Sequence, residues 1–98
     1  MDAPDAIIRQ SAPLRVMAAL SALPRDDASL DFARLKALTG ASDGNLGAHI
    51  DHLARAGYVE VAKTFVARRP RTTVKASPAG RAAFARHVAF LREIIARA

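Results

Sequence analysis

The sequence of 98 residues contains no cysteine and only five aromatic residues. Without cysteine the chain forms neither disulfide bonds nor thiolate metal sites, which is compatible with a reducing cytosol. Hydrophobic residues make up 51% of the chain, but many of them are alanines, so the core must be modest. A single domain of this size buries a limited fraction of its surface, and a partner subunit would help its stability.

Long apolar runs are also missing. The chain has no stretch of 18 apolar residues, and its N-terminus lacks the charged and then apolar pattern of a signal segment. We therefore expect a cytoplasmic protein without a membrane partner. The sequence also lacks a Gly-rich phosphate loop, a nucleophile with a matching histidine and acid, and paired carboxylates at a catalytic spacing. Neither an enzyme nor a bound cofactor is expected.

Acidic residues are almost absent from the second half of the chain. No acidic side chain occurs between Glu60 and Glu93. Residues 1–60 hold six Arg or Lys against eight Asp or Glu, whereas residues 61–98 hold nine against one. Such a segregated basic half is typical of a nucleic-acid binder. The alternative is an arginine-rich composition in which the charges only improve solubility, so the placement of the charges has to decide.

Hydrophobic periodicity predicts a first helical region within residues 7–23. Val16, Leu20 and Leu23 follow one another at i, i+4 and i+7, which places one apolar stripe toward a core. Pro24 is expected to end this helix, because proline cannot continue the hydrogen-bond ladder. A very short extended segment is expected at residues 29–31.

Two helices joined by a short turn are predicted within residues 31–57. Asp31 is the expected N-cap of the first helix, and Gly40 is the expected residue after its last turn. Ser42 or Asp43 caps the second helix, which is expected to stop at Gly57. The apolar face of this second helix consists of Leu46, Ile50 and Leu53. Two helices with a short glycine-containing turn between them are typical of a helix-turn-helix.

The period changes from helical to alternating at residue 58. Residues 58–76 are predicted to form two antiparallel strands, with a loop at residues 68–71 between them. Ser77 and Pro78 are a cap and first-turn pair, and they open a helix over residues 77–97. The expected fold is mainly α with a small β-hairpin, in the order helix, strand, helix, helix, strand, strand, helix. This is a winged helix-turn-helix arrangement, and the hairpin is its wing.

Three motifs carry a family resemblance: D-G-N-L at the start of the third helix, H-L-x-x-A-G-Y-V before the hairpin, and R-R-P-R-T-T within it. From about Ile7 onward the chain resembles the small winged-helix regulators related to the MarR and ArsR types. This resemblance implies binding of duplex DNA as a homodimer with paired terminal helices. Gly47 departs from the pattern, because many relatives have a serine or a larger polar residue there. The departure affects which DNA sequence is bound rather than the fold.

The exposed face of the third helix is the first candidate site. In a helix-turn-helix this face enters the major groove. Asn45 can pair with adenine, and a histidine can donate to guanine or to a phosphate. The free N–H groups at the helix start could hold a phosphate as well. The candidate DNA contacts of this helix are Ser42, Asp43, Gly44, Asn45, Ala48, His49 and His52. The alternative is an ordinary polar helix face.

The hairpin is the second candidate site. Arg68, Arg69 and Arg71 surround Pro70, which is expected to stiffen the tip, and no acid lies near them in the sequence. Arginine at a wing tip is attracted by the negative potential of the minor groove. Threonine hydroxyls and lysines on the strands can reach phosphates. The candidate DNA contacts of the wing are Lys63, Arg68, Arg69, Arg71, Thr72, Thr73 and Lys75. The alternative is a solvated hairpin tip.

His49 and His52 have an i, i+3 spacing that could hold a metal ion. No thiolate or third ligand accompanies them, so no metal site is expected. For Arg15, near the start of the first helix, two interpretations stay open: a solvated charge or a contact to phosphate.

The last helix carries a wider apolar arc than a helix covered on one side needs. One side of the arc can pack on its own domain and the other on a second copy, which predicts a homodimer. The candidate interface residues are Ile7, Ile8, Phe84, Val88, Phe90, Leu91, Ile94 and Ile95. The alternative is a core within one chain. A two-fold dimer would suit two DNA half-sites about one helical turn apart.

The expected function is therefore duplex DNA binding by a homodimeric transcriptional regulator that acts as a repressor. Two other functions stay open. A winged helix can serve as a protein-interaction module, for which the uncompensated arginines would be unnecessary. Binding of RNA or single strands would need exposed aromatic side chains, whereas Tyr58 and Phe65 are both expected to be packed. The residues leave open whether a small-molecule effector exists.

Overall fold

A computed structural model describes residues 11–98 of the chain. Its elements in chain order are α2 (Ser11–Ser21), β1 (Leu30–Asp31), α3 (Phe32–Thr39), α4 (Asp43–Arg55), β2 (Val59–Val66), β3 (Arg69–Ala76) and α5 (Pro78–Arg97). The predicted mainly helical fold with a small antiparallel sheet is confirmed. Ile7 and Ile8, which were expected at a dimer interface, lie outside the described residues.

The predicted capping residues begin and end the helices by local hydrogen bonds. Asp31 accepts from the backbone N–H of Arg34 at 2.8 Å, and Gly40 closes α3 in the left-handed conformation at φ 72°. Of the two candidates for α4, Ser42 is the cap, because its hydroxyl accepts from the N–H of Asn45 at 3.3 Å. Ser77 caps α5. Asp31, Gly40, Ser42 and Ser77 were all candidate caps in the sequence, and each of them caps a helix in the structure.

The first helix ends earlier than predicted. α2 stops at Ser21, whereas Pro24 was expected to end it. The cause is the residue before the proline, since proline disfavours helical backbone at the preceding position. The N–H of Leu23 bonds to the carbonyl of Leu20 at 3.3 Å, so the last turn tightens before Pro24 is reached.

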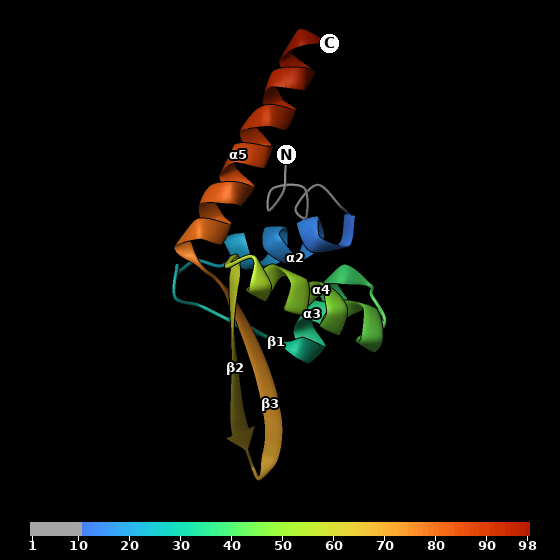
Figure 1. The fold of residues 1–98 in the computed structure, drawn as a ribbon, viewed down its shortest axis with the longest axis vertical. Coiled ribbons are helices and arrows are strands. Elements are labelled where there is room, and N and C mark those ends of the chain that lie inside the picture. The colour runs from blue at the N-terminus through green and yellow to red at the C-terminus, as the bar shows by residue number, and fades with distance from the viewer. Residues whose placement is uncertain (1–10) are drawn as a thin grey trace.

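The three strands form an antiparallel sheet in the order β1, β3, β2. β2 and β3 pair along their whole length, from Val59 opposite Ala76 to Val66 opposite Arg69, whereas β1 covers only Val74 and Thr73 of β3. Within the described chain, the outer half of the hairpin, residues 63–72, therefore has no neighbouring strand. It projects from the body as a free two-stranded ribbon (Figure 1).

The tip of the hairpin differs from the prediction. A two-residue turn at Ala67 and Arg68 connects the strands, and both residues have positive φ, 51° and 66°. Pro70 was expected at the tip, but it lies inside β3 opposite Phe65. Counting from the turn, this pair is not joined by ladder hydrogen bonds, so the nitrogen of Pro70 faces the open side of β3. A proline is tolerated there because no N–H is needed.

The core lies between the three helices of the body and the base of the hairpin. Its fully or nearly fully buried members are Val16, Met17, Leu20, Leu35, Leu46, Ile50, Leu53, Tyr58, Val59, Val74, Ala76 and Ala83. The predicted apolar face of α4 is confirmed, because Leu46, Ile50 and Leu53 all belong to this core. Gly80, in the first turn of α5, lies directly against the backbone of Tyr58.

The molecule is elongated, with principal extents of 53 × 27 × 22 Å. Figure 1 shows the reason: the hairpin leaves the body at one end, and the C-terminal part of α5 leaves it at the other. None of the helices within residues 11–98 is long and apolar enough to cross a membrane.

Candidate nucleic-acid interface

The face of α4 opposite its buried leucines is open to solvent. Asn45, Ala48 and His52 are exposed, and His49 is half-buried. No side chain or other part of the body crowds Gly44 and Gly47, because nothing outside their own stretch of helix lies within 4 Å of the position of a Cβ. Small side chains on an open helix face permit close approach of the backbone to a groove. The structure thus brings together the residues that the sequence analysis grouped on α4.

The turn between α3 and α4 is held by charged side chains. Lys36 near the end of α3 forms an ion pair with Asp43 at the start of α4. Arg15 of α2 donates to the carbonyl of Thr39 at 3.3 Å, at the C-terminal end of α3. Arg15 is an exposed residue, so this contact engages one nitrogen of a guanidinium that still borders solvent. It complements the partial negative charge of a helix end.

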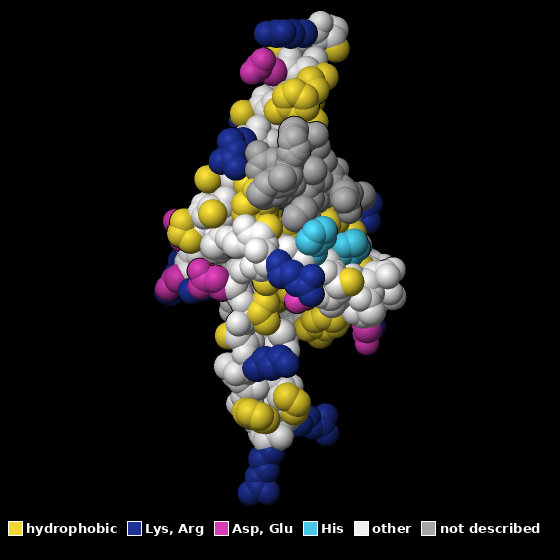
Figure 2. All heavy atoms as spheres, viewed as in Figure 1, with side chains coloured by type: hydrophobic (Ala, Val, Ile, Leu, Met, Phe, Trp, Pro, Cys, Tyr) yellow, Lys and Arg dark blue, Asp and Glu magenta, His cyan; other side chains and the backbone are white. Residues whose placement is uncertain are grey.

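The cations of the wing fall into two groups. Among the described residues, Lys63, Arg68 and Arg69 are exposed and have no acidic partner, whereas Arg71 and Lys75 each have one. On the face drawn in Figure 2, dark blue side chains continue to the hairpin tip, and no magenta lies on its outer half. The outer wing therefore carries uncompensated positive charge, which favours contact with phosphates.

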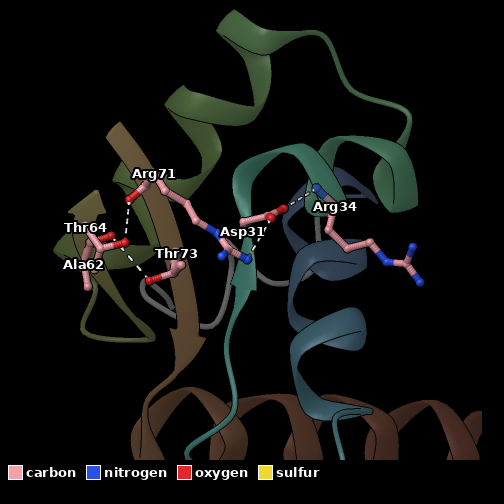
Figure 3. Close-up of polar contacts among 6 residues, drawn as sticks. All are labelled: Asp31, Arg34, Ala62, Thr64, Arg71 and Thr73. Carbon is pink, nitrogen blue, oxygen red and sulfur yellow. Dashed lines mark hydrogen bonds and ion pairs between the residues drawn. The ribbon is translucent and has the colours of Figure 1, made fainter. Parts of the chain in front are cut away.

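Arg71 was expected to be uncompensated, and that expectation is wrong. Its Nη2 donates to Oδ2 of Asp31 at 3.1 Å, while Oδ1 of the same carboxylate accepts from the N–H of Arg34 (Figure 3). Asp31 lies 40 residues earlier in the chain, so no local pattern could indicate the pair. Arg71 thus ties the hairpin to the N-terminus of α3. Lys75 similarly pairs with Glu60 on the neighbouring strand at 3.6 Å.

The threonines of the wing also take part in contacts within the hairpin. Thr73 donates its hydroxyl to the carbonyl of Ala62, and Thr64 donates to that of Arg71, both at 3.4 Å (Figure 3). Thr72 is half-buried beside the start of α3. A phosphate contact from Thr73 would therefore replace an existing hydrogen bond, so Lys63, Arg68 and Arg69 are the freer candidates.

Sequence reasoning missed Phe65. It was expected to be packed, as Tyr58 is, but its side chain is 74% exposed. Both residues belong to the segment before the turn, yet only Tyr58 lies at the base of the hairpin, where the core begins. The length of β2 could have indicated this exposure. A strand of eight residues is too long for a body of this size to cover, so its far end has to lie in solvent.

His49 and His52 of α4 have the spacing of a possible pair of metal ligands. In residues 11–98 no three His, Cys, Asp or Glu side chains are grouped so that they could hold a metal ion. His49 and His52 remain neighbours on the face that is open to solvent.

A helix-turn-helix body with a projecting antiparallel hairpin defines a winged-helix protein. The family model described as winged helix DNA-binding domain matches residues 14–95, and the chain belongs to that family. This is a family of DNA-binding domains and not of enzymes.

Solved structures of regulators have the same fold. A transcriptional regulator homologue from Pyrococcus horikoshii is similar with a TM-score of 0.80 and 30% identity, over 92% of this chain and 85% of that one. A MarR-family transcriptional regulator from Silicibacter pomeroyi is similar with a TM-score of 0.69 and 24% identity, over 96% of this chain and 65% of that one. The second likeness shows the fold alone.

An uncharacterized protein of Methanocaldococcus jannaschii is 34% identical over 58 residues, which cover 59% of this chain and 63% of that protein. The matched part of the chain therefore spans less than two thirds of this relative's length.

Proposed function

We propose that the chain is a homodimeric transcriptional regulator that binds duplex DNA and represses transcription by occluding a promoter. One observation carries the DNA-binding part: the wing projects beyond the body and presents Lys63, Arg68 and Arg69 without acidic partners among the described residues. The similar structure from Pyrococcus horikoshii, described as a transcriptional regulator homologue, supports the same function.

In this proposal α4 lies in the major groove. Asn45 and His52 point from its exposed face toward base edges, with His49 beside them. The N-terminus of α4, with Ser42, Asp43 and Gly44, lies near the phosphate backbone. Ala48 and the two glycines add no bulk, so the groove floor can approach the helix closely. This helix contributes base contacts, whereas the wing contributes affinity through phosphates.

The second copy is proposed to pair through α5. Beyond the body this helix exposes a continuous apolar surface: Phe90, Leu91, Ile94 and Ile95 are all more than one third exposed in a single copy. Phe84 and Val88 continue the surface toward the body, where they line an open groove of about 780 Å³ together with Ser21 and Arg81. Apolar surface of this extent on a projecting helix is typical of an interface. A two-fold partner that buries this surface would give the dimer two equivalent recognition helices.

The dimer makes a direct prediction. Ile94→Asp is expected to convert a dimer into a monomer of 10.4 kDa, because a carboxylate would be buried at the proposed contact without a partner. Analytical ultracentrifugation at micromolar concentration measures this change. Leu38→Asp is the matched control, since Leu38 on α3 is exposed to a similar degree, 52% against 50% for Ile94. A wild-type protein that sediments only as a monomer contradicts the dimer.

Selection of bound duplexes from a random pool tests the DNA-binding proposal itself. We expect wild type to enrich a two-fold symmetric motif with half-sites about one helical turn apart. His52→Ala is expected to alter the bases that are enriched rather than to abolish enrichment, because base contacts set sequence preference and phosphate contacts set affinity. Failure of wild type to enrich any motif would contradict sequence-specific binding.

A further inference from the structure

The most exposed large apolar side chain of the wing is Phe65. It lies near the end of β2, in the part of the hairpin that no third strand covers. Because side chains alternate along a strand, Phe65 shares a face with Val59, which is buried at the base. This face thus begins in the core at Val59 and runs through Val61 and the charged Lys63 to Phe65, whose side chain the described residues leave largely uncovered.

The tip combines this apolar face with positive charge. Phe65 is directly opposite Pro70, and cross-strand partners of this type lie on the same face with their Cβ atoms about 5 Å apart. Next to them the turn presents Arg68, which occupies a left-handed position that favours glycine. Arg69 follows at the start of β3. The end of the hairpin is therefore a narrow apolar edge next to two guanidinium groups that have no acidic partner among residues 11–98.

The same face is directed toward the helix-turn-helix. A hollow of about 290 Å³ lies between the hairpin and the start of α3, and its lining includes Phe32 and Ala33 on one side and Pro70 and Thr72 on the other. Pro70 and Thr72 share the face of Phe65 by strand alternation. A duplex held by α4 and the wing would consequently lie on the side of the hairpin from which Phe65 projects.

We propose that Phe65, backed by Pro70, is a wedge that inserts between base pairs from the minor groove and kinks the bound duplex. This inference rests on the proposed function and adds a mode of recognition to it. Proteins that bend DNA from the minor groove insert apolar side chains between base steps, and arginine or lysine beside them contacts the groove and its phosphates. Flexible pyrimidine–purine steps are the least costly to unstack, so the wedge favours such a step in the flank of each half-site.

Charge and composition favour duplex DNA over other occupants. A protein partner for this tip would have to be acidic and apolar at once, whereas a duplex offers phosphates on both sides of a stack of apolar base faces. Binding of single strands relies on several aromatic platforms in succession, and Phe65 is the only exposed aromatic residue of the described wing.

Phe65→Ala tests the wedge with the duplex that wild type selects. We expect the variant to bind that duplex about tenfold more weakly, in line with the loss of one base–aromatic contact. The salt dependence of binding should stay unchanged, because no charge is removed. Energy transfer between dyes at the two duplex ends should show a kink of about 20° or more with wild type, and its loss with Phe65→Ala. Phe65→Leu retains an apolar wedge and should retain most of the kink.

Val66→Ala is the matched control, because Val66 is the adjacent residue, is 52% exposed, and lies on the opposite face of the same strand. Val66→Ala should bind the duplex with an affinity within about twofold of that of wild type. The kink angle of the bound duplex should likewise stay close to the angle that wild type produces. Circular dichroism verifies that each variant is folded. Equal affinity and equal bending by Phe65→Ala and wild type overturn the wedge alone. Absence of duplex binding by wild type, or tighter binding of a single-stranded oligonucleotide than of the duplex, overturns the proposed function together with the wedge.

Discussion

Replacing Arg68 and Arg69 together by alanine is expected to weaken duplex binding by about 100-fold, since two charge-assisted contacts to phosphates are lost. The plot of log affinity against log salt should become less steep by about 1.8 per copy, because each phosphate contact contributes about 0.9 to the magnitude of its slope. Both arginines are exposed at the tip and have no acidic partner among residues 11–98, so their removal breaks no ion pair in the free protein. Fluorescence anisotropy at several salt concentrations measures affinity and slope together.

A control with the same loss of charge separates local contacts from the net charge. Arg25→Ala combined with Arg97→Ala removes two positive charges from residues that already pair with Asp27 and Glu93. Arg97 lies at the end of the molecule opposite the wing (Figure 1). The control should leave the salt slope unchanged. An equal loss of slope in both double variants would show that only net charge matters, which contradicts a specific role for the wing tip.

Arg68→Gly also tests the role of the wing tip in DNA binding. It is expected to raise the stability of the protein and to lower its affinity for DNA. Arg68 adopts φ 66°, a conformation that glycine tolerates much better than a residue with a Cβ. The variant should therefore raise the free energy of unfolding by about 0.5 to 1 kcal/mol while it weakens DNA binding. A side chain that is retained at a cost in stability is consistent with a role in binding.

Gly80→Ala is expected to have the largest effect on stability. A Cβ at this position would lie 2.0 Å from the carbonyl oxygen of Tyr58 and 2.9 Å from the methyl carbon of Met17. The end of Met17 can move, but the backbone of Tyr58 cannot, because its carbonyl accepts from the N–H of Ser77 at 3.0 Å. The first turn of α5 would have to shift away from the body. We expect a loss of about 3 kcal/mol or more in the free energy of unfolding.

Thermal unfolding followed by circular dichroism measures this loss, with an expected fall in Tm of about 15 °C. Gly47→Ala is the control, because Gly47 also lies in a helix but has nothing within 4 Å of its added Cβ. That variant should be more stable than wild type by about 0.5 to 1 kcal/mol, since alanine is the better helix former. If Gly80→Ala unfolds at the wild-type temperature, the close packing of α5 on Tyr58 is contradicted.

Features that depend on a few consecutive residues were predictable from the sequence. Ser42 and Ser77 each cap a helix by a bond to a backbone N–H three residues later, so the pattern is visible in any short window. The same holds for Gly40 and for the buried positions of α4 at helical spacing. The order of helices and strands, and with it the fold, followed from such local signals.

The rest depends on contacts between distant parts of the chain. The ion pair of Arg71 with Asp31 joins the wing to a helix cap, and nothing near either residue indicates the other. The position of the hairpin turn was misjudged because Pro70 is usually a turn residue, whereas here strand register places it inside β3. Gly80 gives no local sign of its role either, because only the approach of Tyr58 makes the absence of a side chain necessary.

The wing and the C-terminal part of α5 project from opposite ends of the body, and this separation has a genetic consequence under the proposed function. A copy that has lost the cations of its wing still carries an intact α5, so it would join wild-type copies in mixed dimers and inactivate them. Such an allele would be dominant negative. A copy damaged on the outer face of α5 would be excluded from mixed dimers, so its allele would be recessive. Mutations at the two ends of the elongated molecule are therefore expected to differ in inheritance, dominant negative for the wing and recessive for α5.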